Sequence, residues 1–480
     1  MSATRVEQVH PWINGRTGTA SEWVTLRNPY DGTELASVAR TDGPTVHEAV
    51  SSAVAAQRQI AQLPASARAS ILRTAADLVE QDARGFASTI SVQTGKAVKN
   101  ALREVRRGAW TLRAAATAAE TLTGRTFTAS AAPEGAGLLV LAVREPVGVI
   151  GAITPFNAPF NLVLHKVAPA FAAGNAVVVK PSEQAPLSAL DVARLMERAG
   201  APAGAVNVVP GGSETGAHLV DDERVRMLTF TGGRAAGEAI RRAAGLRKVT
   251  LELGGNSPNI VHHDADIEAA VKACVAGGFS NTGQSCNSVQ RIIVHRDIVA
   301  RFGARLVEGV ADLRVGDPLD PDTDVGTLIT AEAAERVQHW LHEAQRSGAR
   351  VLGGERVNAQ LSPAVVFGAP PSSRVVCEEV FGPVVVVQEY TTVDEAIELA
   401  NSTRFGLQSA VFTASLDVAM RVMTGIESGA VLVNRSSNFR LDHLPYGGVK
   451  TSGVGREGPE FAAEEMTEVK LLVMAESVPS

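Results

Sequence analysis

The amino-acid sequence predicts an α/β protein of at least two domains, each built on a parallel sheet that helices cover. Its 480 residues are 45% hydrophobic and 20% charged, and a single hydrophobic core stops growing near about 250–300 residues. From residue 148 onward, short apolar runs alternate with helical stretches, which is typical of parallel sheets. Glycine-rich turns follow two of these runs, as they do where open α/β sheets bind ligands.

The segment before this alternation is expected to be helical and then extended. Val46 to about Thr121 is rich in alanine, with polar residues at helical spacing and breaks at Leu63-Pro64 and Gly95, so we expect three or four helices. Residues 121–147 alternate short apolar runs with turn residues, which predicts a β-hairpin or extended arm. Residues 146–164 are uncharged, but their prolines and asparagines favour a buried strand and turn over a membrane span.

The apolar runs fall into two series and one isolated strand. The first series contains expected strands at 148–153, 176–179, 206–209, 227–230 and 248–253. A second series, from about 267 to 434, contains 290–294, 384–387 and 430–433. Residues 467–473 form a further strand with no strand near it in sequence, which favours pairing with the edge of another subunit.

Composition argues against several classes of function. The net charge of −6 is mixed in sign along the chain, so a nucleic-acid partner is not expected. Cysteine and histidine spacings match neither a disulfide framework nor a metal site. The N-terminal residues lack the apolar core of a secretory signal. We therefore expect a cytoplasmic protein with no membrane partner and no metal.

Two kinds of glycine-rich segment have to be separated. A literal Gly-x-Gly-x-x-Gly at 453–458 has no strand before it and too few residues after it for a βαβ unit, so it predicts a tight loop. Residues 210–216 follow an expected strand and open into a helix, where glycine and the helix N-terminus suit an anionic ligand. A simple helix-capping turn is the alternative there. A second such turn, 230–233, follows the next strand.

The three cysteines differ in their surroundings. Cys286 lies in a polar loop, where a thiol is accessible and a nearby helix end or cation can lower its pKa. Cys274 and Cys377 stand next to apolar residues and are predicted to fill the core. Only Cys286 is therefore a candidate nucleophile.

Two further polar residues stand in apolar surroundings. Glu252 lies between two leucines, which suits a general base of raised pKa, although an outward-facing glutamate on an edge strand is the alternative. Asn157 follows an expected buried strand, where its amide can either donate to an oxyanion or initiate a turn.

Seven short motifs follow one another along nearly the whole chain: Thr154-Pro-Phe-Asn157, Lys180-Pro-Ser-Glu183, Phe230-Thr-Gly-Gly233, Leu251-Glu-Leu-Gly-Gly255, Gly283-Gln-Ser-Cys286, Glu378-Glu-Val-Phe-Gly-Pro383 and Pro445-Tyr-Gly-Gly-Val-Lys450. In kind and order they resemble the NAD(P)-dependent aldehyde dehydrogenase superfamily. Gly233 departs from the pattern, since many members carry serine there, and is expected to alter contacts to the pyrophosphate slightly.

The resemblance implies an aldehyde-dehydrogenase-like α/β fold in three parts. A Rossmann-type NAD-binding domain would comprise residues 1–121 and 146–251, and an α/β catalytic domain residues 252–434. A return segment, 435–458, would contact the active site. Residues 122–145 and 459–480 would form a small β oligomerisation arm, which implies a homodimer or homotetramer.

The resemblance also implies residue roles. By position, Cys286 would be the nucleophile and Glu252 the general base. Asn157 and the backbone N–H of Cys286 would form the oxyanion hole. Lys180 is grouped with this catalytic set, and with Glu183 it would hold the adenosine ribose. The implied cofactor-binding set is Ile153, Thr154, Pro155, Phe156, Lys180, Ser182, Glu183, Gly212, Gly216, Phe230, Thr231, Gly232, Gly233, Leu253, Gly254, Glu379 and Phe381.

The implied reaction is NAD-dependent oxidation of an aldehyde to a carboxylic acid, through a thiohemiacetal and a thioester on Cys286. Water activated by Glu252 would hydrolyse the thioester. NAD is expected in preference to NADP because Glu183 would repel a 2′-phosphate, although NADP remains an alternative. The rival functions are a coenzyme A-acylating dehydrogenase, whose branch typically lacks this glutamate, and a catalytically silent structural protein.

Residues 438–448 and the motif Ser288-Val-Gln-Arg291 resemble lactaldehyde, phosphonoacetaldehyde and semialdehyde dehydrogenases, which favour small polar or anionic aldehydes. Arg107 and Arg440 are candidates for binding an anion, because a guanidinium matches carboxylate or phosphonate oxygens. His443 is a third candidate. The alternatives are arginines that only contact solvent, and an aromatic aldehyde as substrate.

Overall fold

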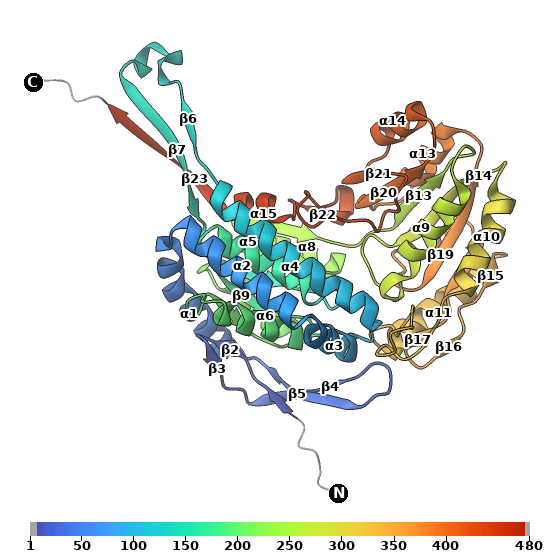
Figure 1. The fold of residues 1–480 in the computed structure, drawn as a ribbon, viewed down its shortest axis with the longest axis horizontal. Coiled ribbons are helices and arrows are strands. Elements are labelled where there is room, and N and C mark those ends of the chain that lie inside the picture. The colour runs from blue at the N-terminus through green and yellow to red at the C-terminus, as the bar shows by residue number, and fades with distance from the viewer. Residues whose placement is uncertain (1–6, 476–480) are drawn as a thin grey trace, which may run out of the picture.

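Two large, mostly parallel sheets form the body of the structure, a computed structural model that describes residues 7–475 (Figure 1). The first sheet has the strand order β22-β12-β11-β8-β9-β10-β2-β3, and its central strands β12 to β10 are parallel. All five strands predicted for the first series lie in it. The bounds are β2 (Trp12–Ile13), β3 (Arg16–Thr17), β8 (Val149–Ile153), β9 (Ala176–Lys180), β10 (Val206–Val208), β11 (Val225–Thr231), β12 (Lys248–Glu252) and β22 (Gly453–Val454).

Four α-helices lie between β3 and β8 in the chain, within the predicted number of three or four. Pro64 caps the second helix, and Gly95 ends the third in the left-handed conformation at φ 71°. A Cβ on Gly95 would lie 1.7 Å from the Thr327 hydroxyl oxygen, so glycine is required there. The helices of this half are α1 (Gly43–Gln62), α2 (Ala65–Gln81), α3 (Ala83–Thr94), α4 (Val98–Thr121), α5 (Asn161–Ala172), α6 (Leu187–Arg198), α7 (Ser213–Asp221), α8 (Arg234–Ala243) and α15 (Pro459–Glu465).

The second sheet has the order β15-β18-β19-β14-β13-β20-β21, parallel except for β15. It contains the three strands predicted for the second series. Its strands are β13 (Ser257–Val261), β14 (Val289–His295), β15 (Arg350–Leu352), β18 (Ala364–Phe367), β19 (Val384–Tyr390), β20 (Gln408–Phe412) and β21 (Ala430–Val433). The helices between them are α9 (Ile267–Phe279), α10 (Val299–Ala311), α11 (Ala331–Arg346), α12 (Arg374–Cys377), α13 (Val393–Asn401) and α14 (Leu416–Gly425). Together the two sheets confirm the predicted α/β class.

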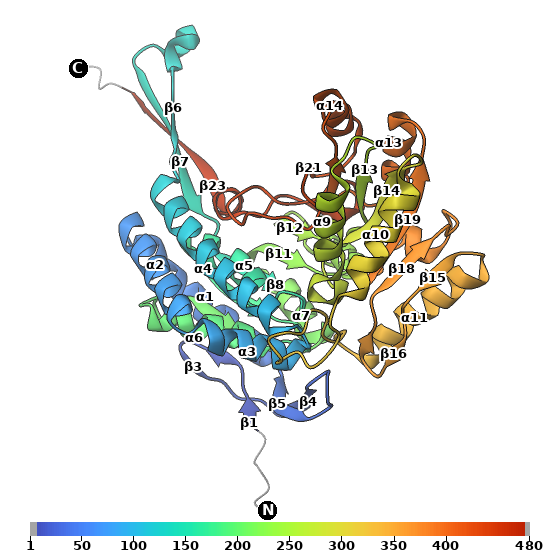
Figure 2. The same cartoon turned by 45° about the vertical axis from the view of Figure 1, so that its right-hand side comes forward.

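A three-stranded antiparallel arm projects from the body (Figures 1 and 2). It consists of β6 (Arg125–Phe127), β7 (Leu138–Pro146) and β23 (Thr467–Ala475), and β23 pairs with β7 from Thr467 to Ala475. The predicted hairpin is thus confirmed, and the isolated C-terminal strand finds its first partner in its own chain. β23 ends the sheet order, so its second edge has no strand partner within residues 7–475.

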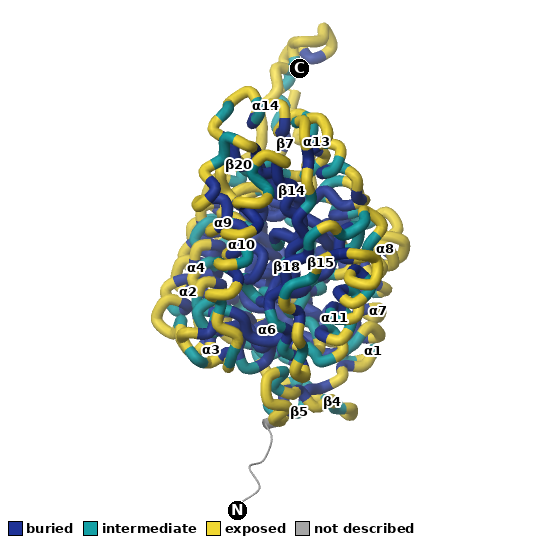
Figure 3. The backbone as a smooth tube through the Cα atoms, turned by 90° about the vertical axis from the view of Figure 1, so that its right-hand side faces the viewer, coloured by how far each residue is buried: buried dark blue, intermediate teal, exposed yellow. Residues whose placement is uncertain are grey.

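Two small sheets complete the fold. One has the order β1-β5-β4 and contains β1 (Glu7–Val9), β4 (Glu22–Arg27) and β5 (Glu34–Arg40). The other pairs β16 (Arg356–Val357) with β17 (Gln360–Leu361). Buried residues gather along the central strands and exposed ones along the outer faces of the helices (Figure 3). In the described part of the chain, no helix combines the length and apolar character that crossing a membrane requires.

The structure decides three of the smaller sequence predictions. Residues 453–458 begin with β22, which pairs antiparallel with β12, and continue as a turn with glycines at positive φ, as expected for a tight loop. Cys274 is buried in the core of the second domain, as predicted. The prediction for Cys377 is wrong, because this residue lies at the end of the short helix α12 and is only partly buried.

Candidate active site

A cavity of about 460 Å³ opens where four neighbouring parallel strands of the first sheet end. Ile153 ends β8, Lys180 ends β9, Thr231 ends β11 and Glu252 ends β12, and all four line the cavity. Parallel strands bring their carboxyl ends to one edge of a sheet, which is where open α/β sheets bind ligands. The other lining residues are Thr154, Pro155, Phe156, Asn157, Ser182, Glu183, Gln184, Phe230, Gly232, Gly233, Leu253, Gly254, Cys286, Glu379 and Phe381.

This lining contains every residue of the expected catalytic and cofactor sets except two glycines. Gly212 caps α7, and a Cβ there would lie 2.8 Å from Glu183 Oε1, so it stands just behind the cavity wall. Gly216, in the first turns of α7, is packed near Lys180 and Ile153. Gln184 was not predicted to lie here. Its position directly after Glu183 was the only available sign.

Glycines let the wall around Glu379 close tightly. A Cβ on Gly254 would lie 2.3 Å from Glu379 Oε2, and one on Gly255 would lie 2.1 Å from the carbonyl oxygen of Cys286. The backbone N–H of Gly255 donates to Glu379 Oε1 over 3.0 Å. Burial raises the pKa of Glu379 to about 7. Phe381 stands at positive φ, with its ring edge-on to Phe156 at 5.8 Å between centroids.

The loop that carries Cys286 is held in an unusual backbone conformation. Asn281 and Thr282 both adopt left-handed φ values, 53° and 56°, within the 3₁₀ turn η3 (Ser280–Gly283). Such values are costly for non-glycine residues and persist only when the surroundings enforce them. The Asn281 side-chain amide donates to the carbonyl oxygens of Asn157 and Gln284, each over 2.9 Å. The Cys286 loop is thereby tied to the segment of Asn157.

Asn157 is fixed through its backbone and keeps its side chain available. The Lys96 ammonium donates to the Asn157 carbonyl oxygen over 2.6 Å and forms a buried ion pair with Glu104. Within residues 7–475, the Asn157 side-chain amide takes part in no hydrogen bond of the structure. Asn157 is buried and lines the cavity, so the amide can donate to an oxygen bound there.

Glu252 is a buried carboxyl group, which rules out the alternative of an outward-facing glutamate on an edge strand. It is 2% exposed, and its strand β12 has neighbours on both sides. Its Oε1 atom has no hydrogen-bond partner among the described residues. Burial raises the pKa of Glu252 well above the usual carboxyl range, and the nearby Glu457 carboxylate adds to this effect. Glu252 can therefore exchange a proton near neutral pH.

The Cys286 thiol contacts the return segment. Its Sγ lies 3.2 Å from the Tyr446 hydroxyl oxygen. Burial raises the pKa of the Cys286 thiol well above its ordinary value, and the Glu252 charge acts in the same direction. The hydrogen bond from Tyr446 and the Arg440 charge act in the opposite direction. The charge on this partly buried thiol thus depends on a few named neighbours.

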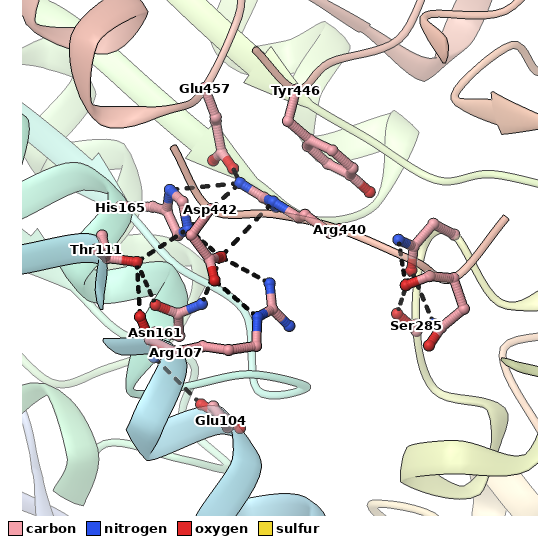
Figure 4. A network of polar contacts seen from close by, with 12 residues as sticks. Glu104, Arg107, Thr111, Asn161, His165, Ser285, Arg440, Asp442, Tyr446 and Glu457 are labelled. Atoms are coloured by element: carbon pink, nitrogen blue, oxygen red, sulfur yellow. Dashed lines mark hydrogen bonds and ion pairs between the residues drawn. The ribbon is translucent and has the colours of Figure 1, made fainter. Parts of the chain in front are cut away.

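A buried polar network continues from Tyr446 (Figure 4). The Arg440 guanidinium lies over the Tyr446 ring at 3.7 Å from its centroid and donates to Glu457 Oε2 over 3.1 Å. Lys166 pairs with the other oxygen of Glu457, also over 3.1 Å. Asp442 accepts hydrogen bonds from Asn161 and Arg107 and contacts His165 Nε2. Opposite charges therefore compensate one another throughout the network.

The three candidate substrate residues differ in how far they are exposed to solvent. Arg440 is 7% exposed in its side chain and so is not one of the solvent-contacting arginines that the alternative foresaw. Its Nε atom has no hydrogen-bond partner among the described residues. Arg107, on α4, is more open at 36% and bound to Asp442, and His443 is exposed. All three line a second cavity of about 570 Å³, between α4 and residues 440–443.

Glu183, in the wall of the first cavity, has a charged neighbour that the sequence did not indicate. Lys180 is buried, and burial lowers its pKa. Glu183 is half exposed, and its Oε1 lies 3.6 Å from Nη2 of Arg40, the last residue of β5. Arg40 lies 143 positions before Glu183 in the chain, so no local pattern points to it.

In residues 7–475, no cluster of three or more His, Cys, Asp or Glu side chains could hold a metal ion.

The aldehyde dehydrogenase family model matches residues 13–472. The chain belongs to the aldehyde dehydrogenase family. The 3-sulfolactaldehyde dehydrogenase of Priestia aryabhattai is 42% identical over 475 residues, covering 98% of this chain and 99% of that relative. These findings confirm the resemblance drawn from the seven motifs.

Solved structures agree with this assignment. Aldehyde dehydrogenase 21 from Physcomitrella patens, solved with its reaction product succinate, has a TM-score of 0.95 and 33% identity and covers 98% of this chain and 99% of its own. The glyceraldehyde-3-phosphate dehydrogenase GapN of Methanocaldococcus jannaschii, complexed with NADP, has a TM-score of 0.91 and 36% identity and covers 95% and 100%. This aldehyde dehydrogenase is therefore an NAD(P)-dependent enzyme that acts on an aldehyde.

Proposed function

We propose that the enzyme oxidises a small polar or anionic aldehyde to its carboxylic acid through covalent intermediates on Cys286. The observation that carries the proposal is that Cys286, Asn157 and Glu252 line one cavity, whose other walls are the expected cofactor-binding residues. The thiolate of Cys286 adds to the carbonyl carbon, which leaves an alkoxide. The Asn157 amide and the backbone N–H of Cys286 stabilise that alkoxide by hydrogen bonds.

The cavity fits a dinucleotide cofactor. The wall is glycine-rich where a backbone must approach a ligand, and the Thr154 hydroxyl is buried without a hydrogen-bond partner among the described residues. When bound, the cofactor supplies a nicotinamide ring that accepts hydride. Glu379 and Phe381 would position that part of the cofactor, and Lys180 and Glu183 the adenosine ribose. Glu183 supports a preference for NAD over NADP, because its charge opposes a 2′-phosphate.

Glu252 supports hydrolysis of the thioester rather than transfer to coenzyme A. Its raised pKa and its unpartnered Oε1 suit a group that takes a proton from water. That water then attacks the thioester carbonyl, and Cys286 leaves as thiolate. A catalytically silent protein would have no need to bury an unpaired carboxyl group beside a cysteine, since such burial costs free energy.

Arg440 and Arg107 support the anionic class of substrate. Both line the second cavity, and their guanidinium groups suit a carboxylate, sulfonate or phosphonate oxygen. That cavity and the first share no lining residue, but Arg440 stacks on Tyr446, and Tyr446 contacts Cys286. Tyr446 therefore links the guanidinium that would bind the anion to the nucleophile.

We also propose that the arm makes the enzyme a homodimer or homotetramer in the cytoplasm. β23 has one edge without a strand partner among residues 7–475, and the arm exposes large apolar side chains, which is unfavourable in an isolated subunit. The most exposed of these are Phe127, Leu139, Val469, Leu471 and Val473. The absence of disulfides among the three cysteines is compatible with a reducing compartment. Analytical ultracentrifugation would give the assembly directly.

The mechanism is tested by two substitutions at the reacting groups. Cys286→Ala should abolish reduction of the cofactor while cofactor binding, followed by fluorescence or calorimetry, persists. Glu252→Gln should give a burst of reduced cofactor and then stall, with a thioester on Cys286 visible by mass spectrometry. Normal turnover of Cys286→Ala would overturn the proposed function. Steady turnover of Glu252→Gln at the parent rate would remove Glu252 from the mechanism.

The substrate class is tested by a panel of anionic, neutral aliphatic and aromatic aldehydes. We expect kcat/KM to be highest for the anionic members. Arg107→Gln should raise KM for these and leave the neutral aldehydes unchanged. A preference for aromatic aldehydes would contradict this part of the proposal.

A further inference from the structure

The Tyr446 side chain is buried between the nucleophile and an arginine. Its hydroxyl oxygen lies 3.2 Å from Cys286 Sγ, and the Arg440 guanidinium carbon lies 3.7 Å from the centre of its ring. Tyr446 is 4% exposed. No other side chain of the described residues makes a hydrogen bond to Cys286 Sγ. Tyr446 is thus the polar group in direct contact with the thiol.

The position of Tyr446 is fixed by its backbone. Its N–H donates to the Glu457 carbonyl oxygen over 3.0 Å, and the Glu457 N–H donates back over 2.6 Å. The Glu457 side chain holds Arg440 and Lys166 by ion pairs. The ring, the guanidinium stacked on it and the carboxylate behind them therefore belong to one rigid unit. Such a unit needs no rearrangement when charge develops on the thiol. It can therefore stabilise the thiolate more than a mobile group could.

Charge considerations decide which atom donates. Burial raises the pKa of Tyr446 well above its ordinary value, so the hydroxyl keeps its proton at neutral pH. A thiolate has no proton to give and accepts a hydrogen bond. The Arg440 cation over the ring withdraws electron density from the phenol, which strengthens the O–H as a donor. The other groups facing Cys286 are the carboxyls of Glu252 and Glu379, both of which disfavour a thiolate.

We propose that Tyr446 is a catalytic residue, whose hydroxyl donates a hydrogen bond to the Cys286 thiolate and whose donor strength is set by the Arg440 guanidinium stacked on its ring. This inference rests on the proposed role of Cys286 as the nucleophile. It goes beyond that role because it assigns the stabilisation of the attacking thiolate to a phenol and an arginine. The groups assigned to the alkoxide, Asn157 and a backbone N–H, act later in the reaction.

The test measures the thiol itself and requires neither aldehyde nor cofactor. In a Cys377→Ser background, which removes the partly exposed cysteine, the rate of alkylation of Cys286 by iodoacetamide is followed against pH by peptide mass spectrometry. Alkylation requires the thiolate, so the midpoint of the profile reports the pKa of Cys286. Tyr446→Phe keeps the ring and removes only the hydroxyl. We expect its midpoint to move upward by roughly one pH unit, the loss of about one charge-assisted hydrogen bond.

The control is Tyr390→Phe, which also removes a buried hydroxyl, one that lies 2.8 Å from His262 Nδ1 and far along the chain from Cys286. It should leave the midpoint where the parent has it. Thermal unfolding of both variants establishes that they are folded. A midpoint that Tyr446→Phe leaves unchanged, or moves no more than Tyr390→Phe does, would overturn the proposal.

A second measurement should shift the midpoint of the Cys286 alkylation profile in the opposite direction. The chain has three tyrosines, so 3-fluorotyrosine can replace them all, and in the Tyr390→Phe background only Tyr30 and Tyr446 are affected. Fluorination makes the phenol a stronger hydrogen-bond donor, so the midpoint should move downward. Tyr30 is exposed on the surface and does not contact Cys286. An upward shift would contradict donation by Tyr446. Loss of oxidation in Cys286→Ala is a separate result, so failure of one proposal is distinguishable from failure of the other.

Discussion

The choice between NAD and NADP should depend on a pair of opposite charges at the far end of the first cavity. Glu183→Ser removes a carboxylate that would face a 2′-phosphate, and it also releases Arg40, whose Nη2 lies 3.6 Å from Glu183 Oε1. At that distance two unit charges interact by about 1.2 kcal/mol in water and about 4.6 kcal/mol at an effective dielectric constant of 20. Both side chains are nearly half exposed, at 46% and 42%, so the value near water applies, about 1 kcal/mol.

We therefore expect Glu183→Ser to raise the ratio of kcat/KM for NADP to that for NAD by roughly tenfold to a hundredfold. When Arg40→Gln is added to Glu183→Ser, this ratio should fall again by roughly fivefold, because about 1 kcal/mol corresponds to that factor. Steady-state kinetics with both cofactors measures the ratio. Glu197→Ser, an equal loss of charge at an exposed position of α6, is the matched control. Equal or better use of NADP by the parent, or an unchanged ratio in Glu183→Ser, would refute this reasoning.

Two further predictions concern buried charges. The folded pKa of Glu252 lies above its unfolded value, so the carboxyl favours the folded state most at low pH, and this contribution falls as pH rises toward the folded pKa by about 1.4 kcal/mol per pH unit. In urea unfolding, the free energy of unfolding of Glu252→Gln minus that of the parent should therefore rise steadily from pH 5 to pH 8. A difference that stays constant with pH would contradict the raised pKa of Glu252. Asp442→Asn leaves His165, Arg107 and Arg440 without their shared carboxylate and should lower the free energy of unfolding by roughly 3 kcal/mol. Glu238→Gln, which breaks an exposed pair with Arg234, should change the free energy of unfolding far less than Asp442→Asn does, and equal costs would contradict the argument from burial.

The parallel strands were predictable wherever they were apolar throughout. Residues 148–153 and 384–387 are such runs, because their strands are covered on both faces. β13 was missed because its sequence, Ser-Pro-Asn-Ile-Val, begins with residues that ordinarily mark turns. Its Asn259 amide bonds to the Ser437 hydroxyl over 3.0 Å, a partner 178 positions away that supplies the hydrogen bond a polar strand residue needs.

The candidate site was predictable where one short segment carries both the residue and its setting. Glu252 stands between leucines, and Cys286 stands in a polar loop, so the immediate neighbours indicate chemistry. Arg440 was harder to place, because its burial depends on Glu457 and Asp442 brought together by the fold. The position of Arg40 beside the site could not be predicted from the sequence, because it depends only on the folded distance between Arg40 and Glu183.

Residues 440–457 pack against side chains from the first half of the chain, such as Lys166, and this affects when the site can form during synthesis. Arg440, Tyr446 and Glu457 all leave the ribosome after the parallel strands of both sheets have been synthesised, and β23 follows them. Until then Lys166 has no counter-charge, since its partner Glu457 is 291 positions away. A nascent chain can fold the parallel strands of its first sheet early, but Cys286 still lacks its contact with Tyr446 at that stage. The Cys286 thiol therefore acquires its final surroundings only after residues 440–457 have been translated, so incomplete chains lack the contact between Cys286 and Tyr446.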